Sequence, residues 1–335
     1  MSDNSVPFQK LLKINKDGYV QDNRYIQTIM HNVAICIPTY KRPLMLQKLL
    51  LSILDCNIDK SIIKDINIIV VDNDIDKTAE TVVTELKEKF YENSKLHYFN
   101  YSKKGLSNVR NELFKRALEY HPDFIVGIDD DEYVTSNWLN ELLITITLTG
   151  GDIAVGPGIP VFEDKVPIYV ASNFKNRNLI NHQNITTFQT TNFIISVNFL
   201  ITQKLEFDER FNTTGAEDSF FGVTAIKRGA KLYWAGKAIA YETILKNRAS
   251  LKWLLNRKFR TAITYTYILI LEKNYLMLLK KILVNILYLL AGIIGLLLLP
   301  FKINRRYWGI LKLAESFGGF AGLVNIKFHE YKNGR

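Results

Sequence analysis

The chain has 335 residues, which is long enough for one large α/β domain with a C-terminal appendage, or for two small domains. Hydrophobic residues make up 47% and charged residues 23%, and this ordinary balance excludes extended disorder as the overall class. The net charge of +10 arises at one end, because residues 243–335 carry 16 Lys and Arg against 3 Asp and Glu, whereas residues 1–242 carry 27 against 30. The slightly acidic first part argues against a nucleic-acid partner.

Residues 1–31 form a polar leader to which we assign no element. The leader contains no hydrophobic core segment, so we expect no secretory signal peptide and place the catalytic part in the cytosol. Two cysteines, Cys36 and Cys56, do not make a disulfide framework. Cys36 stands inside an apolar run, which favours a small buried side chain.

Apolar runs typical of strands alternate with segments of helical periodicity along the first part of the chain. The strand-like runs are residues 33–37, 66–71, 96–100 and 124–128, and the helical segments between them are 44–54, 77–91 and 108–120. Pro38 is expected to end the first strand. Alternation at this spacing predicts an α/β domain with a doubly wound, mostly parallel sheet and a Rossmann-like nucleotide-binding half.

The order is looser after residue 150. Residues 151–158 are expected to form a strand that enters a turn, further strands are expected at 192–200 and 231–241, and a helix is expected to begin at Glu217 and Asp218.

Four consecutive acids, Asp129-Asp130-Asp131-Glu132, follow an apolar run that reads as a buried strand. Burying these carboxylates uncompensated would cost several kcal/mol per ion, roughly, so a cation is expected beside them. Mg²⁺ or Mn²⁺ is the simplest candidate, because both prefer oxygen ligands. A solvated acidic loop before the next helix is the alternative.

Polar residues gather where the predicted strands end. Thr39, Asp72 and Asp129 to Asp131 all follow strands, and ligands of parallel sheets bind outside the carboxyl ends of the strands. Neither GxGxxG nor GxxxxGK[ST] follows the first strand, which disfavours dinucleotide and P-loop sites.

Five motifs together resemble the family 2 glycosyltransferases, over about residues 32–245. They are Ile37-Pro38-Thr39-Tyr40-Lys41-Arg42-Pro43, Val70-Val71-Asp72-Asn73, Lys104-Gly105-Leu106-Ser107-Asn108-Val109-Arg110-Asn111, Ile128-Asp129-Asp130-Asp131 and Gly215-Ala216-Glu217-Asp218. The resemblance implies the GT-A fold and transfer of a sugar, with inversion, from a nucleotide-diphosphate donor to an acceptor hydroxyl. A further segment, Arg248 to Leu255, resembles bacterial enzymes that build exopolysaccharide or other surface glycans.

The resemblance also implies roles for individual residues. Asp131, with Asp129, would hold the metal ion, and Asp130 would reach the ribose. Asp72 would accept the imide N–H of uracil or thymine. The other expected donor-binding residues are Pro38, Thr39, Tyr40, Arg42, Gly105, Asn108 and Arg110.

An acceptor hydroxyl needs a base to remove its proton. Asp218 is the expected base and Glu217 the second candidate. The alternative for this pair is helix-start chemistry, in which acids offset the helix dipole.

Residues 282–301 carry no charge over twenty positions, about the length that crosses a bilayer. Basic residues stand on both sides, so the positive-inside rule gives no orientation, and a spanning or a re-entrant helix both stay open. Residues 308–326 suit a second, interfacial helix. We therefore expect residues 246–335 to associate with the cytoplasmic face of the inner membrane.

Processive members of the family carry a glutamine–arginine–tryptophan signature, which is absent from this sequence. We therefore expect addition of one sugar at a time, to a lipid-linked or other membrane-bound glycan acceptor. Two alternatives are a metal-dependent nucleotidyltransferase and an inactive membrane-associated adaptor with the same fold.

Overall fold

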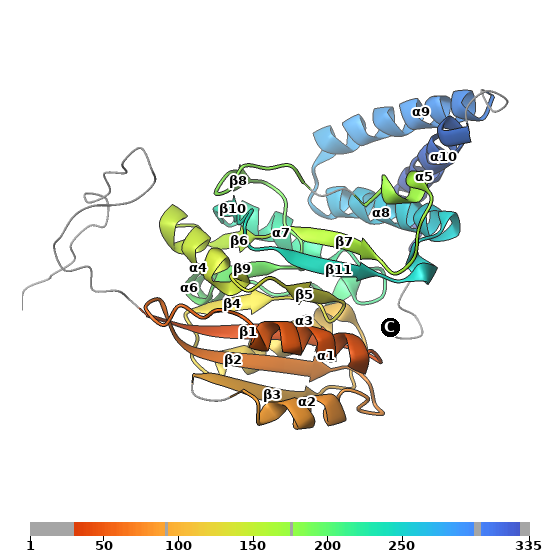
Figure 1. The fold of residues 1–335 in the computed structure, drawn as a ribbon. Helices are drawn as coiled ribbons and strands as arrows, with labels where there is room; N and C mark the ends of the chain where they lie inside the picture. The colour runs from red at the N-terminus through yellow and green to blue at the C-terminus, as the bar shows by residue number, and fades with distance from the viewer. Residues whose placement is uncertain (1–29, 91–92, 175–176, 298–302, 329–335) are drawn as a thin grey trace, which may run out of the picture.

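The computed structural model describes residues 30–90, 93–174, 177–297 and 303–328. Most of the predicted leader, residues 1–29, therefore lies outside the described residues. An α/β part carries two sheets, and three long helices form a separate layer at one side of it (Figure 1).

Within the described residues, the larger sheet has eight strands in the order β3-β2-β1-β4-β9-β6-β10-β8. The pairs β3–β2, β2–β1, β1–β4 and β6–β10 are parallel, whereas β9 and β8 run antiparallel to their neighbours. The predicted α/β class with a mostly parallel sheet is confirmed. The bounds are β1 His31–Thr39, β2 Ile63–Asp72, β3 Ser94–Asn100, β4 Phe124–Gly127, β6 Ile153–Val155, β8 Asn184–Ile185, β9 Phe193–Ser196 and β10 Leu232–Trp234.

The prediction that Pro38 ends the first strand is wrong, since β1 continues to Thr39 and pairs with β2 up to Asp72. The carbonyl of Cys36 faces β4 and that of Thr39 faces the β2 side. Pro38 lies two residues after Cys36, so its backbone nitrogen, which carries no hydrogen, faces the β4 side. The β1–β4 ladder has already ended there, at Cys36, so no ladder hydrogen bond is lost.

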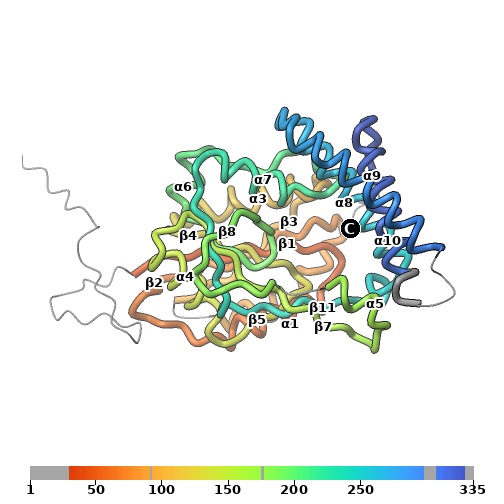
Figure 2. Tube along the Cα trace, turned by 90° about the horizontal axis from the view of Figure 1, so that it is seen from above, coloured from red at the N-terminus to blue at the C-terminus, as the bar shows by residue number. Residues whose placement is uncertain are grey.

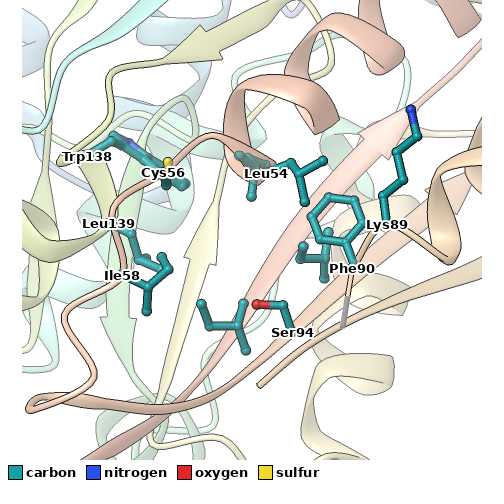
Figure 3. A pocket seen from close by; sticks show the side chains of 11 residues that line it. Leu54, Cys56, Ile58, Lys89, Phe90, Ser94, Trp138 and Leu139 are labelled. Carbon is teal, nitrogen blue, oxygen red and sulfur yellow. The ribbon is translucent and has the colours of Figure 1, made fainter. Parts of the chain in front are cut away.

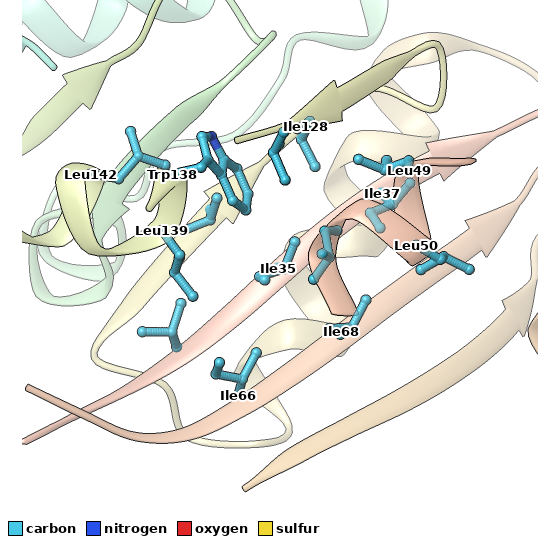
Figure 4. Packing of buried hydrophobic residues seen from close by; sticks show 14 of the residues in the cluster. Ile35, Ile37, Leu49, Leu50, Ile66, Ile68, Ile128, Trp138, Leu139 and Leu142 are labelled. Carbon is cyan, nitrogen blue, oxygen red and sulfur yellow. The ribbon is translucent and has the colours of Figure 1, made fainter. Parts of the chain in front are cut away.

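Helices cover both faces of the sheet, because side chains along each strand alternate between the two faces. On one face, Ile35 and Ile37 of β1 pack against helices α1, α2 and α4, and Figure 4 shows them with Leu49, Leu50 and Trp138. On the other face, Ala34 and Cys36 pack against α3, α6 and α7. The helix bounds are α1 Pro43–Leu54, α2 Glu80–Lys87, α3 Leu106–Leu118, α4 Trp138–Thr149, α5 Ile168–Ala171, α6 Val197–Thr202 and α7 Glu217–Lys227.

The smaller sheet, β5-β11-β7, stands beside the carboxyl end of β4. It contains β5 Glu132–Val134, β7 Gly158–Phe162 and β11 Ala240–Ile244. The predicted strand 231–241 is therefore two strands in different sheets. Similarly, the predicted strand 192–200 is β9 followed by α6, because Ser196 Oγ accepts a hydrogen bond from the N–H of Phe199 and caps a helix.

The C-terminal layer contains α8 Leu251–Leu271, α9 Tyr275–Leu297 and α10 Ile303–Leu323. The predicted apolar segment starts seven residues into α9, and residues 298–301 lie outside the described residues. The second predicted helix begins at Ile303 in the structure. Seen from above, the three helices gather on one side of the α/β part (Figure 2).

Asn192 joins the two sheets from a fully buried position. Its Oδ1 accepts from Trp138 Nε1 at 2.7 Å, and its Nδ2 donates to the carbonyls of Pro157 at 2.9 Å and Ala238 at 2.7 Å. Pro157 and Ala238 immediately precede β7 and β11, so this amide fixes the small sheet against α4.

Asn192→Ala should lower the free energy of unfolding by about 3 kcal/mol, because it leaves the buried indole N–H of Trp138 and the carbonyl of Ala238 without this partner, whereas the carbonyl of Pro157 still accepts from the N–H of Ala240. Denaturant unfolding of the full chain in detergent measures the change. Asn198→Ala, at an exposed position of α6, is the control and should change the value by less than about 0.5 kcal/mol. Equal effects of the two substitutions would contradict the role of Asn192.

Candidate active site

The site lies where the order of the sheet reverses. The chain passes from β1 to β2 and β3 on one side and then returns to place β4 on the other side of β1. The carboxyl ends of β1 and β4 thus flank a topological switch point, the usual ligand crevice of an open α/β sheet. Thr39 Oγ1 donates to Asp130 Oδ2 at 2.9 Å and joins the two strand ends.

Two arginines bind the acids that follow β4. Arg42, directly before α1, donates from Nη1 to Asp130 Oδ1 and Asp131 Oδ2, both at 3.0 Å. Arg248, in the segment between β11 and α8, donates from Nη1 to Asp131 Oδ2 at 2.9 Å and from Nη2 to Glu242 Oε1 at 2.9 Å. The cation that we expected beside the acids is thus supplied in part by guanidinium groups.

Arg110 on α3 connects the acids after β4 to the acid pair of α7. Its Nη2 donates to Asp129 Oδ1 at 3.1 Å, and its Nε lies 3.4 Å from Glu217 Oε1. Burial acts to lower the pKa of Arg110, but the negative charges of Asp129 and Glu217 outweigh it and raise the pKa. Two motifs that lie 88 residues apart in sequence, at Asp129 and Glu217, are therefore brought together by one cation.

Burial raises the pKa of several of these acids even though arginines lie beside them. Burial raises the pKa of Asp130 to about 7 despite the opposing charge of Arg42. Burial also raises the pKa of Asp129 and Glu132, and the neighbouring acids add to both shifts. Oε1 of Glu132 is buried without a hydrogen-bond partner. An unsatisfied acidic oxygen in a cluster of raised pKa values indicates room for further positive charge.

The donor set fits a divalent cation of the kind that uses few protein ligands. Among the described residues, no group of three His, Cys, Asp or Glu side chains is arranged to hold a metal ion. Mg²⁺, however, is commonly held by one or two carboxylates together with substrate phosphates. Asp131 and Asp129 offer hard oxygen ligands beside the unsatisfied Glu132, which is consistent with that mode of binding.

Asp72 is more enclosed than its predicted contact with a base requires. It is fully buried, and its oxygens accept hydrogen bonds from the N–H groups of Asp74 and Ala79 and from the hydroxyl of Tyr98. Asp74 was not predicted, yet its Oδ2 is buried without a hydrogen-bond partner. Asp74 Oδ1 lies 3.6 Å from Lys41 Nζ, in the same loop as Tyr40 and Arg42. Asp74 therefore has a carboxylate oxygen without a hydrogen-bond partner two residues after Asp72.

Gly105 and Asn108 shape the start of α3. Gly105 adopts φ 119°, and a Cβ there would collide with the side chain of Asn212. Oδ1 of the same Asn212 accepts from the N–H of Asn108 at 3.1 Å. Asn108 Oδ1 is buried without a hydrogen-bond partner. The glycine permits this close approach, and the approach positions the helix that carries Arg110.

Glu217 and Asp218 begin α7 but have different surroundings. Glu217 is 4% exposed, and burial, with the charge of Asp218, raises its pKa to about 7 against the effect of Arg110. Asp218 is half-buried and accepts from the N–H of its neighbour Ser219. The preceding Ala216 adopts φ 71°, an uncommon conformation for a residue with a side chain. Strain of this kind is often found at functional sites.

Sequence reasoning missed Arg248, Glu242 and Asp74. Glu242 of β11 pairs in register with Glu132 of β5, and Arg248 lies six residues after Glu242, at the end of the short 3-10 helix Lys246–Arg248. The available signal for Arg248 was a basic residue shortly after a strand, four residues beyond the end of β11. Its partner Asp131 lies 117 residues away, so only the fold reveals the contact.

A cavity of about 170 Å³ lies elsewhere, below α1 and α4 and toward the starts of β2 and β3 (Figure 3). Its lining is mostly apolar, including Ile58, Phe90 and Leu139, with Lys89 and Ser94 at its border. It is remote from the carboxyl ends of the strands and contains none of the acids described above. We therefore do not assign the chemistry to it.

Several known proteins are similar to this chain. The succinoglycan biosynthesis protein ExoM of Rhizobium meliloti (strain 1021) is 27% identical over 241 residues, which cover 71% of this chain and 75% of ExoM. S. aureus TarS has a TM-score of 0.51 at 20% identity, and the match covers 68% of this chain and 38% of TarS.

Two structures with bound ligands have the same fold. TarS 1-349 in complex with UDP has a TM-score of 0.51 at 16% identity, covering 88% of this chain and 92% of that one. GalNAc-T7 with UDP, GalNAc and Mn²⁺ has a TM-score of 0.51 at 14% identity, covering 75% and 55%. At these identities the similarity supports the fold, and the predicted GT-A fold is confirmed.

The sequence profile of glycosyl transferase family 2 matches residues 34–207, which is more than half of the chain and includes the strands and acids of the switch point. The chain therefore belongs to glycosyl transferase family 2.

Proposed function

We propose that this glycosyltransferase moves a sugar from a UDP- or dTDP-sugar to an acceptor hydroxyl, with inversion at the anomeric carbon. The observation that carries the proposal is the position of Arg110, which contacts both Asp129 after β4 and Glu217 at the start of α7. A donor-side acid cluster and an acid pair suited to the acceptor thus face the same crevice. Two structural neighbours, TarS 1-349 and GalNAc-T7, have UDP bound, which supports a uridine donor here.

The nucleotide would lie across the carboxyl ends of β1 and β2. Pro38, Thr39 and Tyr40 would frame it, with Asp72 or Asp74 accepting the imide N–H of the base. Asp130, held by Thr39 and Arg42, would meet the ribose hydroxyls once these replace its present contacts. Arg42 and Arg110 carry guanidinium groups that can turn to the diphosphate, where paired N–H donors match phosphate oxygens.

We propose that Asp131, with Asp129, holds Mg²⁺ or Mn²⁺. Such an ion, when bound, would supply a Lewis acid for the charge that grows on the departing diphosphate. The residues of the chain do the rest of this work: Arg42 and Arg110 neutralise charge, and the buried site limits access of water, which strengthens these interactions.

Asp218 would take the proton of the acceptor hydroxyl. It is more accessible than Glu217, so an acceptor can reach it. Burial and the negative charge of Asp218 raise the pKa of Glu217 to about 7, which keeps Glu217 as the second candidate base.

The acceptor is proposed to be a lipid-linked or surface-glycan precursor, reached at the cytoplasmic face of the inner membrane. ExoM, which is named for succinoglycan biosynthesis, supports an acceptor of the polysaccharide class. One helix, α9, is long and apolar enough to cross a membrane by length and composition, which supports membrane association through residues 246–335. Addition of single sugars is proposed because one apolar helix cannot enclose a translocation channel.

Asp218→Asn should lower the transfer rate by about 10² to 10⁴-fold, the usual contribution of a general base, and leave donor affinity unchanged. Release of UDP with a glycan acceptor measures the rate, and calorimetry measures donor binding. Glu206→Gln, an exposed substitution that also removes one charge, is the control. Near-normal turnover of Asp218→Asn would reject Asp218 as the base.

Donor binding should depend on the metal through Asp131. We expect one UDP- or dTDP-sugar of a panel to bind the full chain about tenfold or more tightly with Mn²⁺ than without it, and Asp131→Ala to remove this difference. A GDP-sugar serves as the negative control, and thermal unfolding checks that the variant is folded. An unchanged metal effect in Asp131→Ala would contradict its role as a ligand.

The transfer rate should fall as the pH drops through about 7, because protonation of Glu217 removes a negative charge that is paired with Arg110 in the site. In Glu217→Gln the group cannot ionise, so the acid limb centred near pH 7 should disappear and the rate should be lower throughout. Profiles of kcat/KM over about pH 5.5 to 8.5 test this prediction. Coincident profiles for the two proteins would assign the titration to another group.

A further inference from the structure

The outer face of α9 is an apolar surface that the described parts of the chain leave uncovered. Only 11% of its most apolar stretch is buried, and Leu276, Leu283, Leu287 and Leu290 are each more than half exposed. These positions are spaced by seven, four and three residues, so they share one face of the helix. Further exposed members of this face are Leu279, Ile286, Ile293, Ile294 and Leu297.

The opposite face of α9 is packed tightly on α10. A Cβ placed on Gly309 of α10 would lie 3.1 Å from the carbonyl oxygen of Gly292. Further along, Ser316 Oγ donates to the carbonyl of Asn285 at 2.7 Å. Because Gly309 meets Gly292 and Ser316 meets Asn285, the two helices run antiparallel over most of their length. Close backbone contact at glycines fixes their relative positions.

On its other side, α10 is packed in the same close manner on α8. A Cβ on Gly318 would collide with the carbonyl of Phe259, and one on Gly322 would lie 2.8 Å from Thr266 Cβ. Leu311 and Leu254 share a buried cluster nearer the starts of these helices. Helices α8 and α10 therefore run parallel, and α10 lies between α8 and α9.

Helix α8 is attached to the catalytic part at both of its ends. Near its start, Trp253 stacks on Phe174, with ring centroids 5.7 Å apart. Near its end, the ring of Tyr267 lies 5.8 Å from that of Phe211, and Glu272 is paired with Lys227 of α7. The whole of α8 thus lies along the side of the catalytic part, as Figures 1 and 2 also show.

These contacts exclude a simple crossing of the bilayer by α9. The helix is about 35 Å long at 1.5 Å per residue, which is as long as a bilayer core is thick. Helices α10 and α8 lie alongside α9, and α8 is bound to the catalytic part at both ends. An upright α9 would therefore place much of the catalytic part in the hydrocarbon. Exposed polar residues of α8, including Lys252 and Asn256, would be placed there too.

We propose that α9 lies flat on an anionic membrane, with its leucine face in the interface and α10 and α8 stacked between it and the catalytic part. The occupant is a lipid surface, for which the charges also fit: Lys273 and Lys280 are exposed beside this face, and the C-terminal region is strongly basic. The proposal specifies how the membrane association put forward under the proposed function is achieved. It does not depend on the identity of the donor or acceptor.

Depth measurements distinguish a flat helix from a spanning one. Single nitroxide labels would be attached to cysteines that replace Leu276, Leu287 or Leu297 in the full chain, bound to vesicles of phosphatidylcholine with phosphatidylglycerol. A flat helix predicts similar depths of about 5–10 Å for all three labels. A spanning helix predicts a middle label about 15 Å deep and shallow labels at the ends, and that profile would overturn the proposal.

Flotation with the same vesicles tests the face itself. The double substitution Leu283→Asp with Leu287→Asp should reduce the bound fraction at least tenfold, whereas Leu148→Asp, at an exposed position of α4, should not. Binding should also weaken when phosphatidylglycerol is omitted or salt is raised. Unchanged flotation of the double variant would show that another part of the chain covers this face or holds the membrane. Because flotation needs no activity, failure of the proposed transfer reaction would leave this result interpretable.

Discussion

Burial of the acids that follow β4 is the constraint on which the site depends. Strands β1 and β4 lie next to each other where the order of the sheet reverses. Asp130 and Asp131, which follow β4, are buried there. Each buried charge without a partner would cost several kcal/mol, roughly. Arg42, Arg110 and Arg248 meet this requirement from three separate segments of the chain. The charge contacts therefore fix the loop after β1, helix α3 and the entry to α8 relative to one another.

The same contacts leave the site short of positive charge. The raised pKa values of Asp129, Asp130 and Glu132 show that the guanidinium groups do not fully offset the cost of burial. A diphosphate would add further negative charge to this cluster, and an arginine that turns to the phosphate leaves its carboxylate. A divalent cation resolves both difficulties at once, since it binds carboxylate and phosphate oxygens together. This electrostatic argument explains why a metal fits although few carboxylates are arranged around one point.

Much of the fold was predictable because the strands and helices in the first half of the chain are determined by residues that are close together in the sequence. The apolar runs that became β1, β2 and β4 and the periodic leucines of α1 depend on neighbouring residues, and a parallel sheet follows from their alternation. Asp72 and Asp129 could be singled out as candidates because Asp72 ends such a run and Asp129 follows one. The later elements could not, because β9 runs antiparallel between β4 and β6 and β11 leaves the main sheet to pair with β5. Strand pairing of that kind depends on tertiary contacts, which local sequence does not encode.

Arg248 shows what this limit means for the site. Its guanidinium contacts Asp131 and also lies 5.5 Å from the ring centre of Trp253, in the first turn of α8. Trp253 stacks on Phe174 of the catalytic part, so the start of the helical layer is packed against the catalytic part. The predicted boundary at residue 245 assigns Arg248 to the C-terminal region, although it contacts Asp131.

The contacts of Arg248 extend across this boundary. A chain that ends at residue 245 would lose Arg248, and with it a charge partner of both Asp131 and Glu242. The segment that leads into the helices placed on the membrane is therefore also part of the structure that holds the acids.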